Sequence, residues 1–213
     1  LPRINQWVTY NLAISFLTPH RIVAEKVKKK KKIAWIHTDY TRVWVDAEDE
    51  LKVWQKYDYV ASISGDVTNT FLQVFPSLAP KIVEIENILS PTFVRKRAEL
   101  QDMDKEFRHE GTITLLSVGR FSDAKNYDNV PDICKRLINE TKLNIKWYII
   151  GYGGDEALIR KKIKEAGMEE HVILLGKRSN PYPYIKACDI YVQPSRYEGK
   201  SVTVREAQML CKP

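Results

Sequence analysis

The chain has 213 residues, of which 44% are hydrophobic and 29% charged, a composition typical of a soluble globular protein with a real core. No apolar run approaches the roughly 18 residues that a membrane-spanning helix needs. The net charge of +7, from 34 basic and 27 acidic residues, favours nucleic acid, an anionic membrane or phosphorylated small molecules as partners.

Strand and helix patterns alternate along the first part of the chain. Strands are expected at residues 12–17, 33–37, 60–64 and 82–86, and helices at 19–28, 46–57 and 66–74. The highly charged segment 90–111 shows no strand pattern. It is predicted to be a helical connector, and therefore a candidate domain boundary.

The second part repeats the alternation more clearly. Strands are expected at 113–118, 145–150, 171–175 and 189–193, and helices at 129–139, 155–166, 182–187 and 201–210, with Gly167 ending the second helix. Such alternation predicts an α/β protein whose parallel sheets are covered by helices on both faces. Ligands of such sheets bind at the carboxyl ends of the strands.

A lysine run from Lys28 to Lys32 concentrates much of the excess charge. One interpretation is a solvated surface loop between two elements. The other is a patch that contacts anionic lipid, where each lysine contributes roughly 1 kcal/mol. Nucleic acid is not an expected partner, because the run lacks interleaved aromatic residues and no nucleic-acid-binding motif occurs.

The three cysteines, Cys134, Cys188 and Cys211, are scattered and odd in number. They form no CxxC pair and no Cys/His spacing of a metal site. We therefore expect a reduced, cytosolic protein with buried thiols and no metal site.

Two cations follow the predicted strand 113–118. In the stretch from Gly119 to Lys125, Arg120 and Lys125 stand five positions apart. They can close on a diphosphate, while Gly119 lets the backbone approach closely. An arginine and a lysine in a loop are more often simply solvated, so this motif is weak alone.

Two glutamates, Glu198 and Glu206, stand eight positions apart after the predicted strand 189–193. Helical side chains lean toward the N-terminus, so Glu206 is expected to point back toward the loop that holds Glu198. Ser201 is a candidate N-cap, and the free N–H groups there favour an anion such as a pyrophosphate. A carboxylate is also suited to binding the vicinal hydroxyls of a ribose.

In this order, the motifs from Gly119 to Pro213 resemble the donor-binding half of retaining glycosyltransferase family 4. The family has a Gly-Arg…Lys phosphate clamp, a Gly-x-Gly loop, a strand ending in Pro-Ser, and the E-x7-E signature. The matching residues here are Gly119, Arg120, Lys125, Gly151, Gly153, Pro194, Ser195, Glu198 and Glu206. The ordered set is specific, although no single member is.

The resemblance implies a role for each matched residue. Arg120 and Lys125 would hold the donor diphosphate, Glu206 the ribose, and Glu198 the transferred sugar. Lys200 and Ser201 would offer backbone N–H groups to the sugar and phosphate, Gly119 and Gly199 would also belong to the donor-binding set, and Arg178 would lie near the base. After Glu-Gly the family usually has an aromatic or aliphatic residue, whereas here Lys200 and Ser201 follow.

The first half of the chain matches the later part of an acceptor domain, less specifically. His37 stands at a strand end where the family often has a histidine facing the donor sugar, although a lone histidine is more often structural. The resemblance thus implies a GT-B fold of two Rossmann-like domains facing a cleft. Residues 1–106 would form a partial acceptor-side domain and residues 107–213 the donor domain, in a chain that begins and ends inside the fold.

The implied activity is transfer of a sugar, with retention, from a nucleotide sugar to a cell-surface glycan or glycolipid. UDP-sugar is the favoured donor, and the catalytic set is His37, Glu198, Arg120 and Lys125, with no metal or other cofactor. The expected place is cytoplasmic and peripheral on the inner face of the membrane. Two alternatives stay open: a nucleotide-sugar epimerase on the same fold, and a non-catalytic basic module that binds lipid or nucleic acid.

Overall fold

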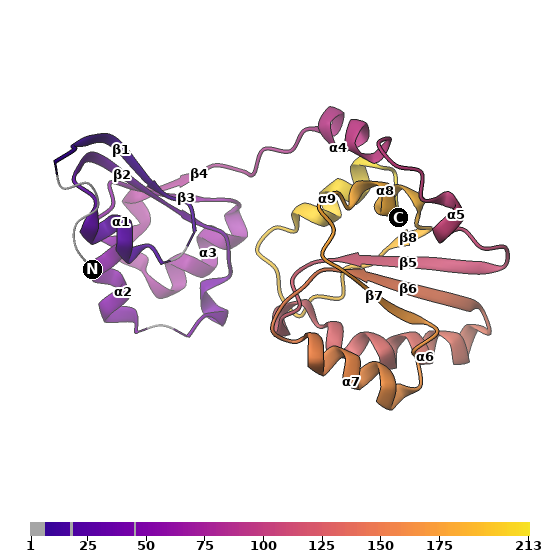
Figure 1. Ribbon diagram of the computed structural model, residues 1–213. Helices are drawn as coiled ribbons and strands as arrows, with labels where there is room; N and C mark the ends of the chain where they lie inside the picture. The colour runs from indigo at the N-terminus through magenta and orange to yellow at the C-terminus, as the bar shows by residue number, and fades with distance from the viewer. Residues whose placement is uncertain (1–6, 18, 45) are drawn as a thin grey trace. The chain divides into compact units, whose positions relative to one another are not determined.

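A computed structural model describes residues 7–17, 19–44 and 46–213. The chain divides into two compact units, Leu1–Ile88 with Glu198–Lys200, and Leu89–Tyr197 with Ser201–Pro213 (Figure 1). The division falls upstream of the boundary at 106/107 expected from the sequence. Helix α4 (Pro91–Ala98) packs on α8 (Tyr182–Ala187) and α9 (Val202–Met209), so the charged connector belongs with the second unit.

Four parallel strands form the sheet of the first unit, in the order β1-β2-β3-β4. They are β1 (Tyr10–Ser15), β2 (Lys29–Ile36), β3 (Tyr59–Ser62) and β4 (Ile82–Glu84). The connecting helices are α1 (Arg21–Lys26), α2 (Ala47–Trp54) and α3 (Gly65–Val74), with 3-10 turns at Tyr40–Arg42 and Pro76–Lys81. Every strand and helix expected in this half is confirmed, with shifted ends.

Side-chain caps begin two of these helices. The Asp46 side chain accepts a hydrogen bond from the Asp49 N–H before α2, and Ser64 accepts one from Val67 before α3. Such caps satisfy N–H groups that have no partner inside the helix. The short polar side chains therefore determine where the two helices begin.

One face of the first sheet carries the core of its unit. Phe71, fully buried, packs edge-on against Trp54 and Tyr40 with ring centroids 5.0 and 5.1 Å apart. On the opposite face Leu12 and Ile14 are each 48% exposed. The strand order never reverses, so right-handed crossovers place the connecting helices on the same side. The expectation of helices on both faces is thus wrong for this sheet, as far as the described residues show.

The lysine run is not the solvated loop that was one interpretation of it, because Lys29–Lys32 form the first half of β2. Lys32 is buried; its ammonium donates to the Ala24 carbonyl, and its N–H donates to the Asp58 carboxylate over 2.6 Å. Lys28, Lys30 and Lys31 are exposed. The run pairs with β1, where Tyr10 lies opposite Lys29 and Ala13 opposite Lys32, and a lysine stem fits a pleated strand when its charge finds a partner.

The second unit also has a parallel sheet, in the order β7-β6-β5-β8. Its strands are β5 (Thr112–Val118), β6 (Asn144–Ile150), β7 (Val172–Gly176) and β8 (Ile190–Tyr191). Helices α6 (Val130–Thr141) and α7 (Glu156–Ala166) pack on one face. Helix α5 (Asp104–Phe107) packs on the other face together with α8 and α9 (Figure 1). The predicted alternation is confirmed here, with helices on both faces.

Central strands of this sheet are apolar on both sides. Leu115 and Trp147 are buried beneath α6 and α7, whereas their neighbours Leu116 and Tyr148 are buried on the α8 side. Alternation of side chains with period two explains why consecutive residues enter different cores. Gly167 ends α7 with a φ of 66°, the left-handed conformation predicted for it.

The strand order reverses once in this second sheet. From β5 the chain moves outward to β6 and β7, and then returns to place β8 on the other side of β5. Loops that leave β5 and β8 therefore diverge at the carboxyl ends of adjacent strands. Such a switch point is where open α/β sheets bind ligands.

Two of the three cysteines are buried as predicted, and burial raises the pKa of Cys134 to about 11 and that of Cys188 to about 12. The prediction is wrong for Cys211, which is exposed just after α9. In the described part of the chain, no helix has both the length and the apolar character that crossing a bilayer requires.

Candidate functional site

The loop after β5 carries the first predicted cation pair. A Cβ atom at Gly119 would lie 2.6 Å from the Tyr127 hydroxyl and 3.3 Å from Cε of Lys125. The Lys125 stem therefore folds back over Gly119, while Arg120 is exposed beside it. The short turn Asp123–Lys125 and the left-handed Asn126, with φ of 59°, reverse the chain to make this possible.

The Gly-x-Gly loop after β6 packs on the loop after β5. A Cβ atom at Gly151 would lie 1.9 Å from the carbonyl oxygen of Gly119, and one at Gly153 would lie 2.2 Å from that of Phe121. The Phe121 N–H donates to the Tyr152 carbonyl over 2.9 Å. Both glycines are required for this close contact between loops, which fixes Gly119 and Arg120 from one side.

The loop after β8 is joined to the loop after β5 from the other side. The Arg196 guanidinium donates to both carboxylate oxygens of Asp128, over 3.0 and 2.8 Å. Asn126 donates from its amide to the Pro194 carbonyl over 2.9 Å, and the Arg196 N–H donates to the Ala124 carbonyl. The hydrogen bonds from Arg196 hold the pKa of Asp128 below its usual value. A bidentate pair of this kind fixes both loops at the switch point.

Three cationic side chains line one pocket at the carboxyl ends of β5, β6 and β7. The pocket has a volume of about 190 Å³, and its walls include Arg120, Tyr152, Lys177 and Arg178. The Lys177 ammonium lies 5.0 Å from the ring centre of Tyr152, and the Arg178 guanidinium 6.0 Å from that of Tyr184. The structure thus brings Arg120 and Arg178, two of the predicted site residues, into the lining of one pocket.

Helix α9 begins at this edge of the sheet. Ser201 is its N-cap, as predicted, and accepts a hydrogen bond from the Val204 N–H over 3.4 Å. Glu206, in the second turn, is 9% exposed, and the Tyr182 hydroxyl donates to its Oε1 over 2.8 Å. Burial raises the pKa of Glu206, while the hydrogen bond from Tyr182 acts in the opposite direction.

Glu198, Gly199 and Lys200 group with the first unit rather than with α9. The Lys200 ammonium forms an ion pair with Glu86 over 2.8 Å. A Cβ atom at Gly199 would lie 2.4 Å from the carbonyl oxygen of His37. The structure therefore places the first glutamate of the predicted signature in the same unit as His37, and the second in the other unit.

His37 follows β2 and lines a pocket of about 170 Å³ with His20, Trp35 and Tyr40. Its ring contacts Phe16 edge-on, with centroids 4.6 Å apart. Burial lowers the pKa of His37, so the imidazole is neutral at physiological pH. Its Nε2 atom is buried and makes no hydrogen bond within the described structure. A buried ring nitrogen in this state is available to a ligand.

Several residues that shape the site were missed by sequence reasoning. They are Tyr182, which contacts Glu206, and Asn126, Asp128 and Arg196, which join two loops. Asn126 had a local signal, because asparagine tolerates the left-handed conformation better than most residues. No local signal in the sequence indicated the contacts of Tyr182 and Arg196, because their partners Glu206 and Asp128 lie 24 and 68 positions away.

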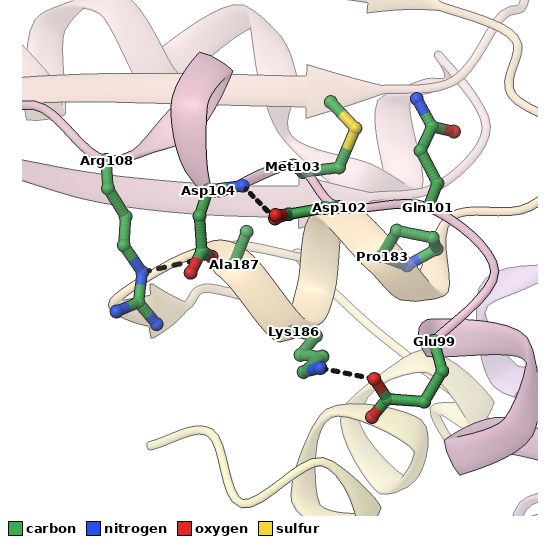
Figure 2. A pocket seen from close by; sticks show the side chains of 9 residues that line it. All are labelled: Glu99, Gln101, Asp102, Met103, Asp104, Arg108, Pro183, Lys186 and Ala187. Carbon is green, nitrogen blue, oxygen red and sulfur yellow. Dashed lines mark hydrogen bonds and ion pairs between the residues drawn. The ribbon is translucent and has the colours of Figure 1, made fainter.

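A larger pocket, of about 280 Å³, lies away from these residues, between α5 and the end of α8 (Figure 2). Its charged walls pair with one another, Lys186 with Glu99 over 2.7 Å and Arg108 with Asp104 over 3.2 Å. The lining of this pocket includes none of the predicted site residues. Within the described ranges, no three His, Cys, Asp or Glu side chains gather as a metal-binding set.

Comparison with known proteins gives a family match over residues 99–213, to the family described as glycosyl transferases group 1. A curated relative from Campylobacter jejuni is 36% identical over 93 residues, or 44% of this chain and 24% of the relative. It is named N-acetylgalactosamine-N,N'-diacetylbacillosaminyl-diphospho-undecaprenol 4-alpha-N-acetylgalactosaminyltransferase. The amylovoran biosynthesis glycosyltransferase AmsD of Erwinia amylovora is 27% identical over 152 residues, or 64% of this chain and 42% of the relative. The chain thus spans less than half the length of either relative.

A solved structure shows the same fold. The pneumococcal O-GlcNAc transferase GtfA, in complex with UDP and GlcNAc, matches with a TM-score of 0.67 and 21% identity. The match covers 95% of this chain and 40% of that one. The predicted GT-B class is therefore confirmed.

Proposed function

Because this chain belongs to the glycosyl transferases group 1 family, we propose that it transfers a sugar, with retention, from a UDP-sugar to a glycan or lipid-linked acceptor. The observation that carries the proposal is the pocket at the carboxyl ends of β5, β6 and β7, which Arg120, Lys177 and Arg178 line. Three cations around 190 Å³ favour a diphosphate, and the Tyr152 ring beside them suits a nucleobase.

Donor binding is divided among the loops. Arg120 and Lys125 take the diphosphate, Arg178 lies toward the base, and Glu206 binds the ribose hydroxyls. The backbone N–H groups of Lys200, Ser201 and the first turn of α9 add partial positive charge that favours binding of the same diphosphate. Gly119 and Gly199 have no side chain, which lets the diphosphate approach the backbone closely. When UDP leaves, these fixed cations offset its developing charge, so we propose that no metal takes part.

We propose that His37 and Glu198 contact the transferred sugar. A neutral imidazole whose Nε2 lacks a protein partner can hydrogen-bond a sugar hydroxyl. Glu198 is exposed, as a residue that contacts a mobile ligand should be. The names of the two curated relatives, which concern a diphospho-undecaprenol-linked saccharide and the biosynthesis of amylovoran, support a glycan or lipid-linked acceptor.

The exposed lysines Lys28, Lys30 and Lys31 give the first unit a basic strand. We propose that the Lys28–Lys32 segment contacts anionic lipid, which brings the enzyme to a membrane-linked acceptor. Sedimentation with vesicles tests this: replacing the three exposed lysines by glutamine should abolish binding to phosphatidylserine-containing vesicles. Equal binding by that variant and the wild type would contradict a role for the strand.

Calorimetric titration of UDP and GDP into the 213-residue chain, with EDTA present, tests the donor site. UDP should bind, and Arg120→Ala and Glu206→Ala should each weaken it by more than tenfold, about 1.4 kcal/mol. Arg136→Ala and Glu140→Ala, a surface pair on α6, are the matched controls and should leave binding unchanged. Failure of a folded chain to bind either nucleotide would overturn the proposal.

Stereochemistry needs a separate measurement. Proton NMR of slow donor hydrolysis should show the released sugar first in the anomeric configuration of the donor. Release of the opposite anomer would establish inversion. An epimerase would instead change the sugar while it is still attached to UDP, and a purely basic binding module would bind salt-sensitively and unaffected by Glu206→Ala.

A further inference from the structure

The hydrogen bond between Tyr182 and Glu206 joins two helices at the donor site. Tyr182 is the first residue of α8, and Glu206 lies in the second turn of α9. The distance from the hydroxyl to Oε1 is 2.8 Å. Among the described side chains, Tyr182 is the hydrogen-bond partner of this carboxylate, so Oε2 has no protein donor.

The Tyr182 hydroxyl stays protonated at neutral pH and can therefore donate a hydrogen bond to Glu206. Burial, followed by the Glu206 carboxylate, raises the pKa of Tyr182 to about 12, so its hydroxyl keeps its proton at neutral pH. A neutral hydroxyl that donates to a carboxylate forms a charge-assisted hydrogen bond, about twice as strong as one between neutral groups. The bond therefore favours one orientation of a side chain that is otherwise buried among apolar groups.

Tyr182 is itself held by its surroundings. Phe93 on α4 packs edge-on against its ring, with centroids 6.2 Å apart and an angle of 87°. Helix α4 is anchored nearby, because Arg95 Nε donates to the Met209 carbonyl over 3.3 Å and Asn180 donates to the Arg97 carbonyl over 2.9 Å. The phenol thus has little freedom to turn away from Glu206.

The chain path links this contact to the nucleotide pocket. Lys177 and Arg178 line the pocket, and only three residues separate Arg178 from Tyr182. The loop after β7 therefore carries cations at its start and the partner of Glu206 at its end. One short segment therefore carries both the cations of the pocket and the hydrogen-bond partner of the carboxylate.

We propose that Tyr182 is a positioning residue that holds Oε1 of Glu206, so that Oε2 is presented to the ribose hydroxyls of the donor nucleotide. The inference rests on the proposed function, in which Glu206 binds the ribose. It adds a residue that sequence reasoning did not single out, and it assigns different tasks to the two carboxylate oxygens. A vicinal diol needs a carboxylate in a defined orientation, which an unrestrained glutamate would adopt only part of the time.

Titration with UDP and 2′,3′-dideoxy-UDP tests the proposal. Tyr182→Phe should weaken UDP binding by about fivefold, since one hydrogen bond is lost, and should change dideoxy-UDP binding less than twofold. Tyr148→Phe is the matched control, because it removes a hydroxyl from the same apolar cluster and keeps the ring stacked on Phe107. It should change neither affinity. Thermal unfolding of each variant checks that the fold is intact.

A double-mutant cycle decides whether Tyr182 acts through Glu206. If it does, adding Tyr182→Phe to Glu206→Ala should not weaken UDP binding further. Additional weakening in that background would overturn the proposal, as would equal losses for UDP and dideoxy-UDP or no loss at all. The proposed function fails separately: if the wild type does not bind UDP, both ideas fall. If it binds UDP and dideoxy-UDP equally well, the ribose role of Glu206 is wrong.

Discussion

The two sheets of this protein share a parallel topology, and they differ in whether the strand order reverses. In the first unit the strands run in sequence order, and among the described residues the helices pack on one face. In the second unit the order reverses at β5 and β8, and helices cover both faces. Right-handed crossovers explain both results, since the face that a helix covers depends on the direction in which the chain moves across the sheet.

The reversal also separates the loops and creates a place for a ligand. In the second unit the loops after β5 and β8 leave adjacent strands and are joined by Arg196, Asp128 and Asn126. In the first unit the corresponding edge presents His37, whose Nε2 is buried without a described partner. The comparison teaches that protein contacts hold the loops after β5 and β8 in place, whereas the Nε2 atom of His37 has no hydrogen-bond partner among the described residues.

The largest expected effect comes from removing core aromatic volume in the one-faced unit. Phe71→Ala should lower the free energy of unfolding by about 3–5 kcal/mol, because Phe71 is fully buried among aromatic rings. Phe16→Ala, at a residue that is 51% exposed, should cost less than about 1 kcal/mol. Urea unfolding followed by circular dichroism measures both. Similar losses of unfolding free energy for the two variants would show that Phe16, which is partly exposed, contributes as much to stability as the buried Phe71.

The second-largest effect is expected from a substitution at the contact between the loops after β5 and β6 in the second unit. Gly151→Ala should cost about 1–3 kcal/mol and weaken UDP binding, because its Cβ would lie 1.9 Å from a backbone oxygen. Gly154→Ala is the matched control, since a Cβ atom there meets nothing within 4 Å. Hydrogen exchange of β5 and β6 locates the damage. Unchanged stability and UDP affinity of Gly151→Ala would mean that the loops after β5 and β6 separate easily.

The smallest effect concerns the pair that joins the loops after β5 and β8. Asp128→Asn should cost about 1 kcal/mol at neutral pH, since the side chains of Arg196 and Asp128 are 31% and 22% exposed and solvent screens part of their attraction. Glu140→Gln, which breaks the more exposed pair with Arg136, should cost less, because solvent screens that pair more fully.

The stability difference between the wild type and Asp128→Asn should depend on pH, and the shifted pKa of Asp128 sets the direction. The folded chain holds the pKa of Asp128 below its usual 3.8, so the charged form stabilises the fold above pH 3.8. That contribution is lost as the pH falls through the folded-state pKa. Unfolding curves of wild type and Asp128→Asn should therefore converge in acid. A difference that persists undiminished there would mean that the pair stabilises by packing alone.

Local signals were enough to predict the elements. Apolar periodicity, the cap Ser201 and the stop at Gly167 act over a few residues, and the expected strands and helices were found with shifted ends. The lysine run is the instructive exception. One interpretation of its charges was a solvated loop, but pairing with β1 made it a strand, with Lys32 buried and hydrogen-bonded to the Ala24 carbonyl.

By itself the sequence determined the class of fold and the order of its strands and helices, because those depend on spacing along the chain, while the site residues that it predicts stay predictions. Tertiary structure decided which face each helix covers and which unit holds each glutamate of the pair Glu198 and Glu206. It alone revealed the contacts of Tyr182 and Arg196. Such contacts join residues that are far apart in sequence, and a hydrogen bond depends on distances and angles that spacing along the chain does not encode.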